Sequence, residues 1–590
     1  MTTHMNRREL IQKTIAGFGA LSLPLSLTAC GDDDPEHPSP DAPQIQFLHG
    51  VASGDPLADR VILWTRLSPE DTAMRLEVQW EIATDQAFQH IVNTGKVLTT
   101  QAQDFTVKVD ADGLEANQTY FYRFRYGAQS SPVGQTKTLP LDTAAVKFAV
   151  CSCSNYPAGY FHVYKEMAKE NLDVVIHLGD YIYEYGADGY ATEDAEKLGR
   201  TLAADNNQEI IRLDDYRKRY ALYRRGDADL QAVHQRHPFI VIWDDHELTN
   251  DTWMEGAENH QDNEGDFFAR KLAALQAYFE WMPIRPVSEN DHLNIYRQFN
   301  FGQLVQLNML DTRVLARHKQ LDYAHYLTAT GLDAARFSAD LTDTNRTLLG
   351  RTQFTWLAQQ LTQSQAIWNV LGQQVLMAKM LIPAEILQVL GQITSGQATV
   401  ETLANVERML VELVTLKSRY LQGDPTLTAQ EKARILTVVP YNLDAWDGYA
   451  YEREALYSVL GQLGKKVVVL AGDTHNAWSA QLYDAQQNFV GVELATSSVS
   501  SPGMEKYLQI PAAKLYEFEF AFNTLIDELS YCNLNQRGYL TVSFTADEML
   551  AEWKFVNTVK AADYQLDDAR YHRLQYTPAL VEIKDLPASA

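Results

Sequence analysis

The chain is poor in cysteine and in basic residues. Its 590 residues include only four cysteines, Cys30, Cys151, Cys153 and Cys532. This number excludes a scaffold held together by disulfides. Lys and Arg together number 50 against 76 acidic residues, which gives a net charge of -26. Proteins bind nucleic acid and anionic membranes mainly through Lys and Arg. We therefore expect no non-specific binding of this chain to nucleic acid or to anionic membranes. A phosphate-bearing ligand must then be attracted locally, most simply by metal ions.

The N-terminal apolar segment, residues 15–29, is too short to span a bilayer. A basic stretch with Arg7 and Arg8 precedes it, so the segment resembles a twin-arginine signal peptide, with an ordinary Sec signal as the alternative. Residues 27–31 resemble a lipobox in which Cys30 would be lipidated; the alternative is cleavage nearby to give a free periplasmic protein. We therefore expect the twin-arginine export machinery to deliver a folded protein to the periplasm or cell envelope, with a lipid anchor on Cys30.

The chain after the predicted signal peptide (1–30) has several kinds of segment. Residues 31–44 are acidic and Pro-rich, as in a solvated linker. From 45 to 140, short alternating strands separated by turn residues predict an all-β sandwich of the immunoglobulin or fibronectin kind. From 141 to 590, apolar strands alternate with helical stretches, which predicts a layered α/β domain. Helical periodicity near 383–435 predicts an insertion that packs through its apolar face, with a lid as the alternative.

One apolar run, Val174–Leu178, ends in Gly-Asp, and a tyrosine follows closely. Asp180 therefore lies at the carboxyl end of a predicted buried strand, where α/β proteins place ligands. Tyr183 can reach the same point. A Tyr phenolate has a free pKa of about 10, so as a ligand it needs a strongly Lewis-acidic ion such as Fe(III). The motif suggests a ferric site that shares a carboxylate with a second metal; for the motif in isolation, the alternative is a buried Tyr on a turn.

Polar side chains also follow three other predicted strands. Carboxylates at this density repel one another without a counterion, so cations are the simplest explanation. The combination points to two or more metal ions that clamp a phosphoryl group and activate water. The three strand ends carry Cys151 and Cys153; Asp244, Asp245, His246, Glu247 and Asn250; and Asp473 and His475.

These motifs together resemble those of the alkaline phosphatase D (PhoD-like) family of metallophosphoesterases. The resemblance runs from about residue 45 to the end, outside the insertion. It implies a metallophosphoesterase-like αββα sandwich that follows the β-sandwich domain, and it implies a phosphoric ester hydrolase. The motifs that carry it include SCSNY at 152–156, HLGDYIYEYG at 177–186, WDDHE at 243–247, LDTR at 310–313 and AGDTHN at 471–476.

The resemblance also implies a metal cluster of one ferric ion with calcium. By position, it implies Cys153, Tyr183 and His475 as iron ligands, with Asp180 as the bridge to calcium. The donor chemistry agrees, because anionic thiolate and phenolate stabilise Fe(III). A zinc site on Cys151, Cys153 and a His is the alternative.

For calcium, the resemblance implies Asp245, Asn250 and Asp473 as ligands. Carboxylate and carboxamide oxygens suit this hard cation. At Asn250 the chain departs from the family pattern, because it reads Leu-Thr-Asn-Asp-Thr-Trp where a pair of Asn before Trp is expected.

The predicted reaction is hydrolysis of phosphomonoesters or phosphodiesters, small-molecule or lipid, at alkaline pH by metal-activated water. His246 is a predicted catalytic residue that protonates the leaving oxygen; the alternative is that it orients Asp245. Arg313 is a predicted phosphate clamp, with an ion pair to a neighbouring carboxylate as the alternative. Two other functions stay open: a phospholipase-D-like phosphodiesterase acting on envelope lipids or polymers, and a non-catalytic envelope-binding protein with a structural metal cluster.

Overall fold

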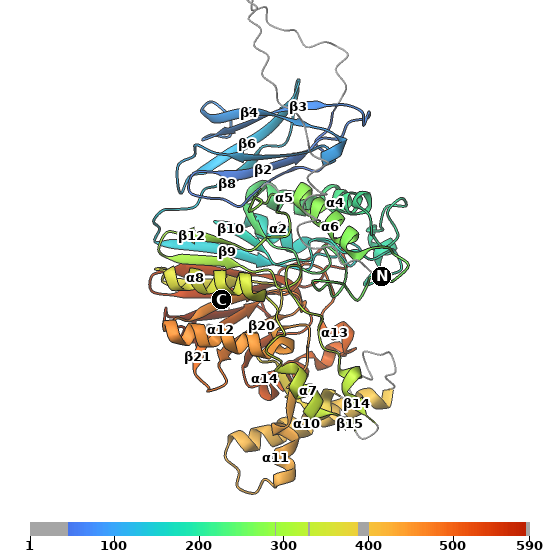
Figure 1. Cartoon of the computed structure of the whole chain (residues 1–590), viewed down its shortest axis with the longest axis vertical. Helices are drawn as coiled ribbons and strands as arrows, with labels where there is room; N and C mark the ends of the chain where they lie inside the picture. The colour runs from blue at the N-terminus through green and yellow to red at the C-terminus, as the bar shows by residue number, and fades with distance from the viewer. Residues whose placement is uncertain (1–44, 289–290, 329–330, 388–399, 586–590) are drawn as a thin grey trace, which may run out of the picture. The chain divides into compact units, whose positions relative to one another are not determined.

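The computed structural model describes residues 45–288, 291–328, 331–387 and 400–585 (Figure 1). The predicted signal peptide, lipobox and linker lie outside these residues. Among the helices of the described ranges, none combines the length and the apolar character that crossing a membrane requires.

The largest sheet has ten strands in the order β26-β25-β24-β23-β9-β10-β11-β1-β2-β5. Its four central strands β9, β10, β11 and β1 pair in parallel, so their carboxyl ends lie at one edge. The strands are β1 (Val51–Gly54), β2 (Val61–Arg66), β5 (Thr106–Ala111), β9 (Ala145–Cys151), β10 (Val174–His177), β11 (Pro238–Val241), β23 (Arg537–Thr545), β24 (Met549–Val556), β25 (His572–Tyr576) and β26 (Glu582–Asp585).

A second sheet has seven strands in the order β12-β13-β16-β19-β21-β20-β22. Strands β13, β16, β19 and β21 pair in parallel at its centre. The strands are β12 (Arg297–Phe301), β13 (Val305–Met309), β16 (Trp368–Gly372), β19 (Val467–Ala471), β20 (Ala477–Tyr483), β21 (Phe489–Ala495) and β22 (Leu529–Asn533).

The two sheets share one apolar core. The ring of Phe148 in β9 lies 4.9 Å from that of Phe301 in β12, measured between centroids. The indole of Trp553 in β24 donates a hydrogen bond of 2.9 Å to the carbonyl of Ala495 in β21. Burial of the facing apolar surfaces holds the two sheets together.

Helices cover the outer faces of both sheets (Figure 1). On the ten-stranded sheet, α2 contacts β23 and β24, and α5 contacts β1. On the seven-stranded sheet, α12 contacts β21 and packs against α8. This arrangement is the predicted αββα sandwich. The covering helices are α2 (His162–Lys169), α4 (Leu213–Gly226), α5 (Ala228–Arg236), α6 (Phe267–Trp281), α8 (Gly350–Gln363) and α12 (Ala450–Leu463).

The N-terminal region packs a five-stranded sheet on one face of β1, β2 and β5, through a core that includes Leu63, Ile82 and Phe124. Strand β1 pairs in parallel with β11, so one layer of this sandwich belongs to the ten-stranded sheet. Residue 140 thus divides two sequence segments that share a sheet. The five strands are β3 (Leu76–Ala83), β4 (Ile91–Thr99), β6 (Thr119–Tyr126), β7 (Gln129–Ser130) and β8 (Gly134–Lys137).

The predicted insertion contains two described helices, α10 (Val400–Leu421) and α11 (Ala429–Leu436). They lie between β17 (Leu381–Pro383) and β18 (Val438–Pro440), which pair antiparallel. Helix α10 packs against α14 (Leu515–Leu525), so its apolar face is used for packing. Residues 388–399 of the insertion lie outside the described residues. The buried apolar positions of α10 are Val406, Leu410, Leu413 and Leu416.

Short elements connect these layers. They are η2 (Gln101–Gln103), α3 (Ala195–Leu198), η3 (Tyr323–Tyr326), β14 (Leu327–Thr328), β15 (Gly331–Leu332), α7 (Ala334–Leu341), η4 (Trp446–Tyr449), α13 (Met504–Tyr507) and η5 (Ala512–Lys514).

Candidate active site

The candidate site forms at the carboxyl ends of β9, β10 and β11 in one sheet and of β19 in the other. Parallel strands of one sheet end at the same edge, so the loops that follow them meet there. The structure thereby brings together polar groups that lie more than 300 residues apart in the sequence, from Cys153 to His475.

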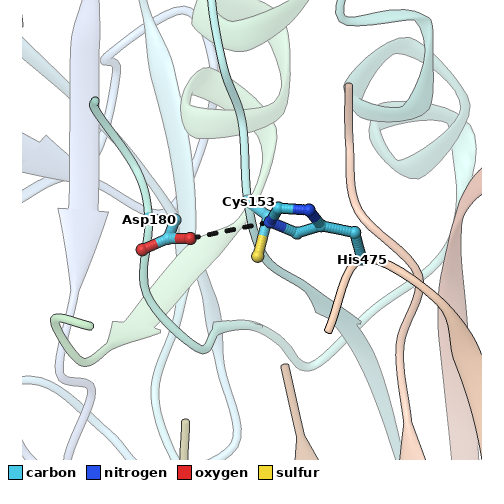
Figure 2. Close-up of side chains that lie close together, drawn as sticks. All are labelled: Cys153, Asp180 and His475. Carbon is cyan, nitrogen blue, oxygen red and sulfur yellow. Dashed lines mark ion pairs between the residues drawn. The ribbon is translucent and has the colours of Figure 1, made fainter. Parts of the chain in front are cut away.

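The first group of the site contains Cys153, Asp180 and His475, whose donor atoms all lie within 4.8 Å of one another (Figure 2). The hydroxyl of Tyr183 donates to the Asp180 Oδ2 atom at 3.0 Å and lies 3.2 Å from the His475 Nε2 atom. All four side chains are buried. The four residues predicted to lie on or beside iron are therefore gathered in one buried cluster.

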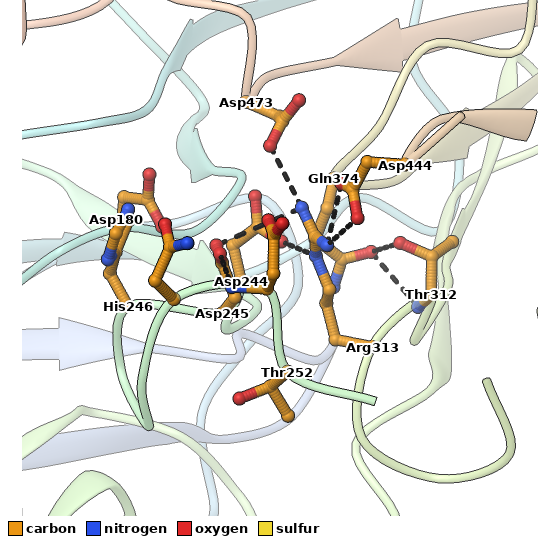
Figure 3. A network of polar contacts seen from close by, with 12 residues as sticks. Asp180, Asp244, Asp245, His246, Thr252, Thr312, Arg313, Gln374, Asp444 and Asp473 are labelled. Carbon is orange, nitrogen blue, oxygen red and sulfur yellow. Dashed lines mark hydrogen bonds and ion pairs between the residues drawn. The ribbon is translucent and has the colours of Figure 1, made fainter. Parts of the chain in front are cut away.

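Two further groups adjoin the first (Figure 3). Donor atoms of Asp180, Asp245 and His246 lie within 4.8 Å of one another, and so do those of Asp244, Asp245 and Asp473. Asp180 belongs to two groups and Asp245 to two, so the three groups form one chain. Each shared carboxylate occupies a position from which it can contact two ions.

The three groups adjoin a cavity of about 300 Å³. His246 and Asn250 also line it, and the Asn250 amide donates to the Glu258 carboxylate at 2.8 Å. Two of the lining carboxylates, Asp251 and Asp444, lie outside the predicted ligand set. The carboxylates that line the cavity are Asp180, Asp245, Asp251, Asp444 and Asp473.

Four of the candidate ligands have left-handed backbone conformations. Their φ angles are 61° for Cys153, 57° for Asp180, 63° for Asp473 and 62° for His475. This conformation costs a non-glycine residue about 1–2 kcal/mol and persists only where the surrounding structure imposes it. The backbone at each strand end therefore turns sharply, and the side chains converge on one point.

Glycine at position 179 lets the loops after β10 and β11 approach each other. Gly179 has a φ of 105°, and a Cβ atom there would lie 2.3 Å from the Cβ atom of Asp244. Any side chain would therefore separate Asp180 from the second loop.

Glu247 joins the same two loops. The sequence motifs include this residue but predict no role for it. Its fully buried carboxylate accepts hydrogen bonds from the backbone N–H groups of Asp180, Tyr181 and Asp244 at 3.0, 2.5 and 2.8 Å. Burial, with repulsion from Asp180, raises the pKa of Glu247 to about 8. The residue fixes the backbone of two candidate ligands, which a sequence pattern does not reveal.

A second residue without a sequence assignment, Glu184, holds His246. The Glu184 carboxylate accepts from the His246 Nδ1 atom at 2.7 Å and from the backbone N–H of Asn250 at 2.7 Å. Although burial alone lowers the pKa of His246, the charges of Asp245 and Glu184 raise it well above its ordinary value. The Nδ1 atom of the imidazole is thus fixed by Glu184, and the ring lies beside Asp245.

Arg313 forms ion pairs with the carboxylates of the site (Figure 3). The Arg313 Nε atom bonds to Asp244, the Nη1 atom to Asp444 at 2.9 Å and the Nη2 atom to Asp473 at 2.9 Å. The side chain is fully buried and is not among the residues that line the cavity. All three nitrogens are engaged with carboxylates, as in the ion-pair alternative, and the role of Arg313 as a phosphate clamp stays a prediction.

The donor set fits metal ions. The Oδ1 atom of Asp180 and the Oδ2 atom of Asp244 are buried without a hydrogen-bond partner, an arrangement that a cation would satisfy. Burial, together with the charge of Asp180, raises the pKa of both the Cys153 thiol and the Tyr183 phenol well above the ordinary values. A bound cation would favour their anionic forms.

The zinc alternative is not assembled among the described residues. Cys151 belongs to none of the groups of potential metal ligands found there. Its Sγ atom instead lies 3.8 Å from the carbonyl oxygen of Ile176. Strand β9 ends at Cys151, and Cys153 has a left-handed backbone, so the alternation that would place both thiols on one face does not reach Cys153.

Two family models match the chain: the PhoD-like phosphatase over residues 148–553, and the N-terminal domain of PhoD-like phosphatases over residues 33–140. The chain belongs to the PhoD-like phosphatase family. It is 36% identical over 516 residues to alkaline phosphatase D of Bacillus subtilis (strain 168). The aligned region covers 84% of this chain and 76% of that protein. A solved structure of PhoD matches with a TM-score of 0.71 at 31% identity, and the match covers 94% of each chain.

The family membership confirms the resemblance seen in the sequence and the predicted fold class. It also makes this PhoD-like phosphatase a phosphoric ester hydrolase. The alternative of a non-catalytic envelope-binding protein is thereby set aside.

Proposed function

We propose that this PhoD-like phosphatase is an exported, metal-dependent phosphoesterase that holds Fe(III) among Cys153, Tyr183 and His475, and Ca²⁺ beside Asp245 and Asp473. The observation that carries the proposal is the environment of Asp180. One of its carboxylate oxygens accepts from Tyr183, and the other is buried without a partner. Because its donor atoms lie near both a thiol–imidazole group and a carboxylate group, Asp180 is suited to bridge two unlike ions.

The two sides of Asp180 differ in chemistry, and this difference supports the two metals. On one side, a thiol, a phenol and an imidazole supply the donors that stabilise Fe(III). On the other, the carboxylates of Asp244, Asp245 and Asp473 supply the oxygen atoms that Ca²⁺ prefers. The Asn250 side chain lines the cavity beside them.

The side chains of the site supply the remaining parts of a hydrolytic reaction. Bound metal ions would neutralise charge on the phosphoryl oxygens and lower the pKa of water. His246, which Glu184 holds through Nδ1 and which lines the cavity, would donate a proton to the leaving oxygen. The Thr474 hydroxyl accepts from the indole of Trp478 at 2.8 Å, so its own hydrogen is available to a phosphoryl oxygen.

Metal removal tests the iron and calcium assignment. The protein as purified should contain iron and absorb visible light through a tyrosinate-to-iron charge-transfer band, and Tyr183→Phe should lose this band. A calcium-selective chelator should abolish phosphoesterase activity while the colour persists, because iron is held by anionic ligands and calcium by weaker oxygen contacts. Added Ca²⁺ should restore turnover. Recovery of a fully stripped protein with Zn²⁺ alone would contradict the proposal.

The substrate proposal covers phosphomonoesters and phosphodiesters, including phospholipids or polymers of the envelope. A panel of a monoester, a diester and a phospholipid, assayed at alkaline pH, distinguishes a general phosphoesterase from a phospholipase-D-like enzyme. Hydrolysis confined to the phospholipid would identify the second.

Export and anchoring are proposed from the sequence of residues 1–30. Substitution of both Arg7 and Arg8 by Lys should block export, because the export receptor recognises the arginine pair as an address. Cys30→Ser should move active protein from the membrane fraction to the soluble periplasm. Cell fractionation followed by activity assay measures both effects; an unchanged distribution of either variant would reject the corresponding part of the proposal.

A further inference from the structure

The active-site cavity has an uncharged wall beside its carboxylates. Tyr441, Met504 and Tyr507 line it together with the aspartates of the metal groups. Uncharged apolar surface adds little to the binding of a metal ion or a phosphoryl anion, both of which need charged or polar partners. This wall therefore faces the organic group of a bound phosphoester.

Tyr507 in this wall is both exposed and fixed in orientation. Its side chain is 45% exposed. Its hydroxyl donates to the Tyr190 hydroxyl at 2.8 Å, and the two rings are parallel within 5° at a centroid distance of 6.3 Å. The Tyr190 hydroxyl in turn donates to the carbonyl oxygen of Pro502 at 3.1 Å. An aromatic surface is thus held in place before any substrate binds.

The short helix α13, which carries Met504 and Tyr507, is tied to the site at several points. The backbone N–H of Met504 donates to the Asn476 Oδ1 atom at 3.1 Å. A Cβ atom at Gly503 would lie 2.5 Å from the Asn476 Nδ2 atom, so the chain approaches this residue as closely as a glycine permits. These contacts fix the wall relative to the loop of Asp473 and His475.

We propose that Tyr507, with Met504, binds the organic group of the phosphoester and favours esters whose organic group presents an aromatic ring. This inference rests on the proposed phosphoesterase function of the same site. An aromatic ring gains from contact with a preoriented Tyr ring and with a Met sulfur, whereas a methyl group does not. From the strength of aromatic pairs, the gain corresponds to about 3- to 10-fold in kcat/KM.

Kinetics on two esters test the inference. Phenyl phosphate and methyl phosphate are assayed with the metal-loaded wild type and with Tyr507→Ala. The measured quantity is the ratio of kcat/KM for phenyl phosphate to that for methyl phosphate in each enzyme. Because the intrinsic reactivity of each ester is the same for both enzymes, it cancels when the ratios are compared. The ratio should fall by about 3- to 10-fold in Tyr507→Ala, mainly through a higher KM for phenyl phosphate.

Two control variants separate ring contact from other roles of Tyr507. Tyr507→Phe keeps the ring and its parallel packing against Tyr190 and loses the hydroxyl contact, so its ratio should fall much less than that of Tyr507→Ala. Tyr516→Ala removes a ring from α14 that is 68% exposed and does not line the cavity. This variant should keep the wild-type ratio.

Three results would overturn the inference. If Tyr507→Ala keeps the wild-type ratio while both esters are hydrolysed, the inference fails and the proposed function stands. If Tyr507→Phe lowers the ratio as much as Tyr507→Ala, Tyr507 acts by holding Tyr190 and not by ring contact. If the wild type hydrolyses neither monoester but does hydrolyse the diester or the phospholipid of the substrate panel, the inference fails and the proposed function stands; if it hydrolyses none of them, both fail.

Discussion

Asp180→Asn is expected to abolish phosphoester hydrolysis, with a loss of about 10³-fold or more in kcat/KM, which corresponds to several kcal/mol of transition-state stabilisation. The substitution keeps the shape of the side chain and a residue type that tolerates the left-handed backbone at this position. It removes the charge that the group of Cys153 and His475 shares with the group of Asp245 and His246. It also places an amide N–H₂ group in an environment built to contact cations.

Steady-state kinetics, metal analysis and circular dichroism together measure this effect. The matched control is Asp188→Asn, which changes an exposed carboxylate in the same loop and should leave turnover and metal content at wild-type values. An Asp180→Asn variant that keeps both its metals and its turnover would show that the shared carboxylate is not needed.

Arg313→Met is expected to lower the free energy of unfolding of the metal-free protein by about 3–5 kcal/mol, because removing one partner leaves buried carboxylates without a counterion. The carboxylates concerned are those of the fully buried Asp244 and the partly buried Asp473, with Asp245 3.8 Å away; Asp444, which Arg313 also contacts, keeps its ion pair with Arg317. Met has a similar apolar stem, so the loss of charge is the main change.

Denaturant unfolding with and without added metal ions distinguishes the cause. Bound cations would neutralise the same carboxylates, so adding metal should reduce the deficit of Arg313→Met relative to the wild type. Arg351→Met, on the exposed side of α8, is the control and should change stability little. A deficit that is equally large with metal would point to lost packing and not to lost charge compensation.

Local patterns predicted the candidate ligands because each pattern contains its own physical reason. A buried strand that ends in Gly-Asp requires no distant residue to place a carboxylate at the sheet edge. The Gly-Asp ending gave Asp180 at the end of β10 and Asp473 at the end of β19, and the structure has both there. Glu184 and Glu247 stood in the same motifs, but their acceptor roles depend on backbone N–H groups of other loops.

The sequence by itself determined the αββα fold class, the family and the types of donor that meet at the site. The layered α/β character and the donor types follow from hydrophobic periodicity and from residues next to strand ends, which are local, whereas the αββα arrangement and the family were implied by the resemblance that the motifs carry. Only the tertiary structure decided that Arg313 pairs with Asp444 from beyond the insertion, that β1 continues the catalytic sheet through β11, and that Tyr507 stands in the cavity wall. Each of these joins segments far apart in the chain, and their contact follows from the packing of the two sheets, which no local pattern encodes.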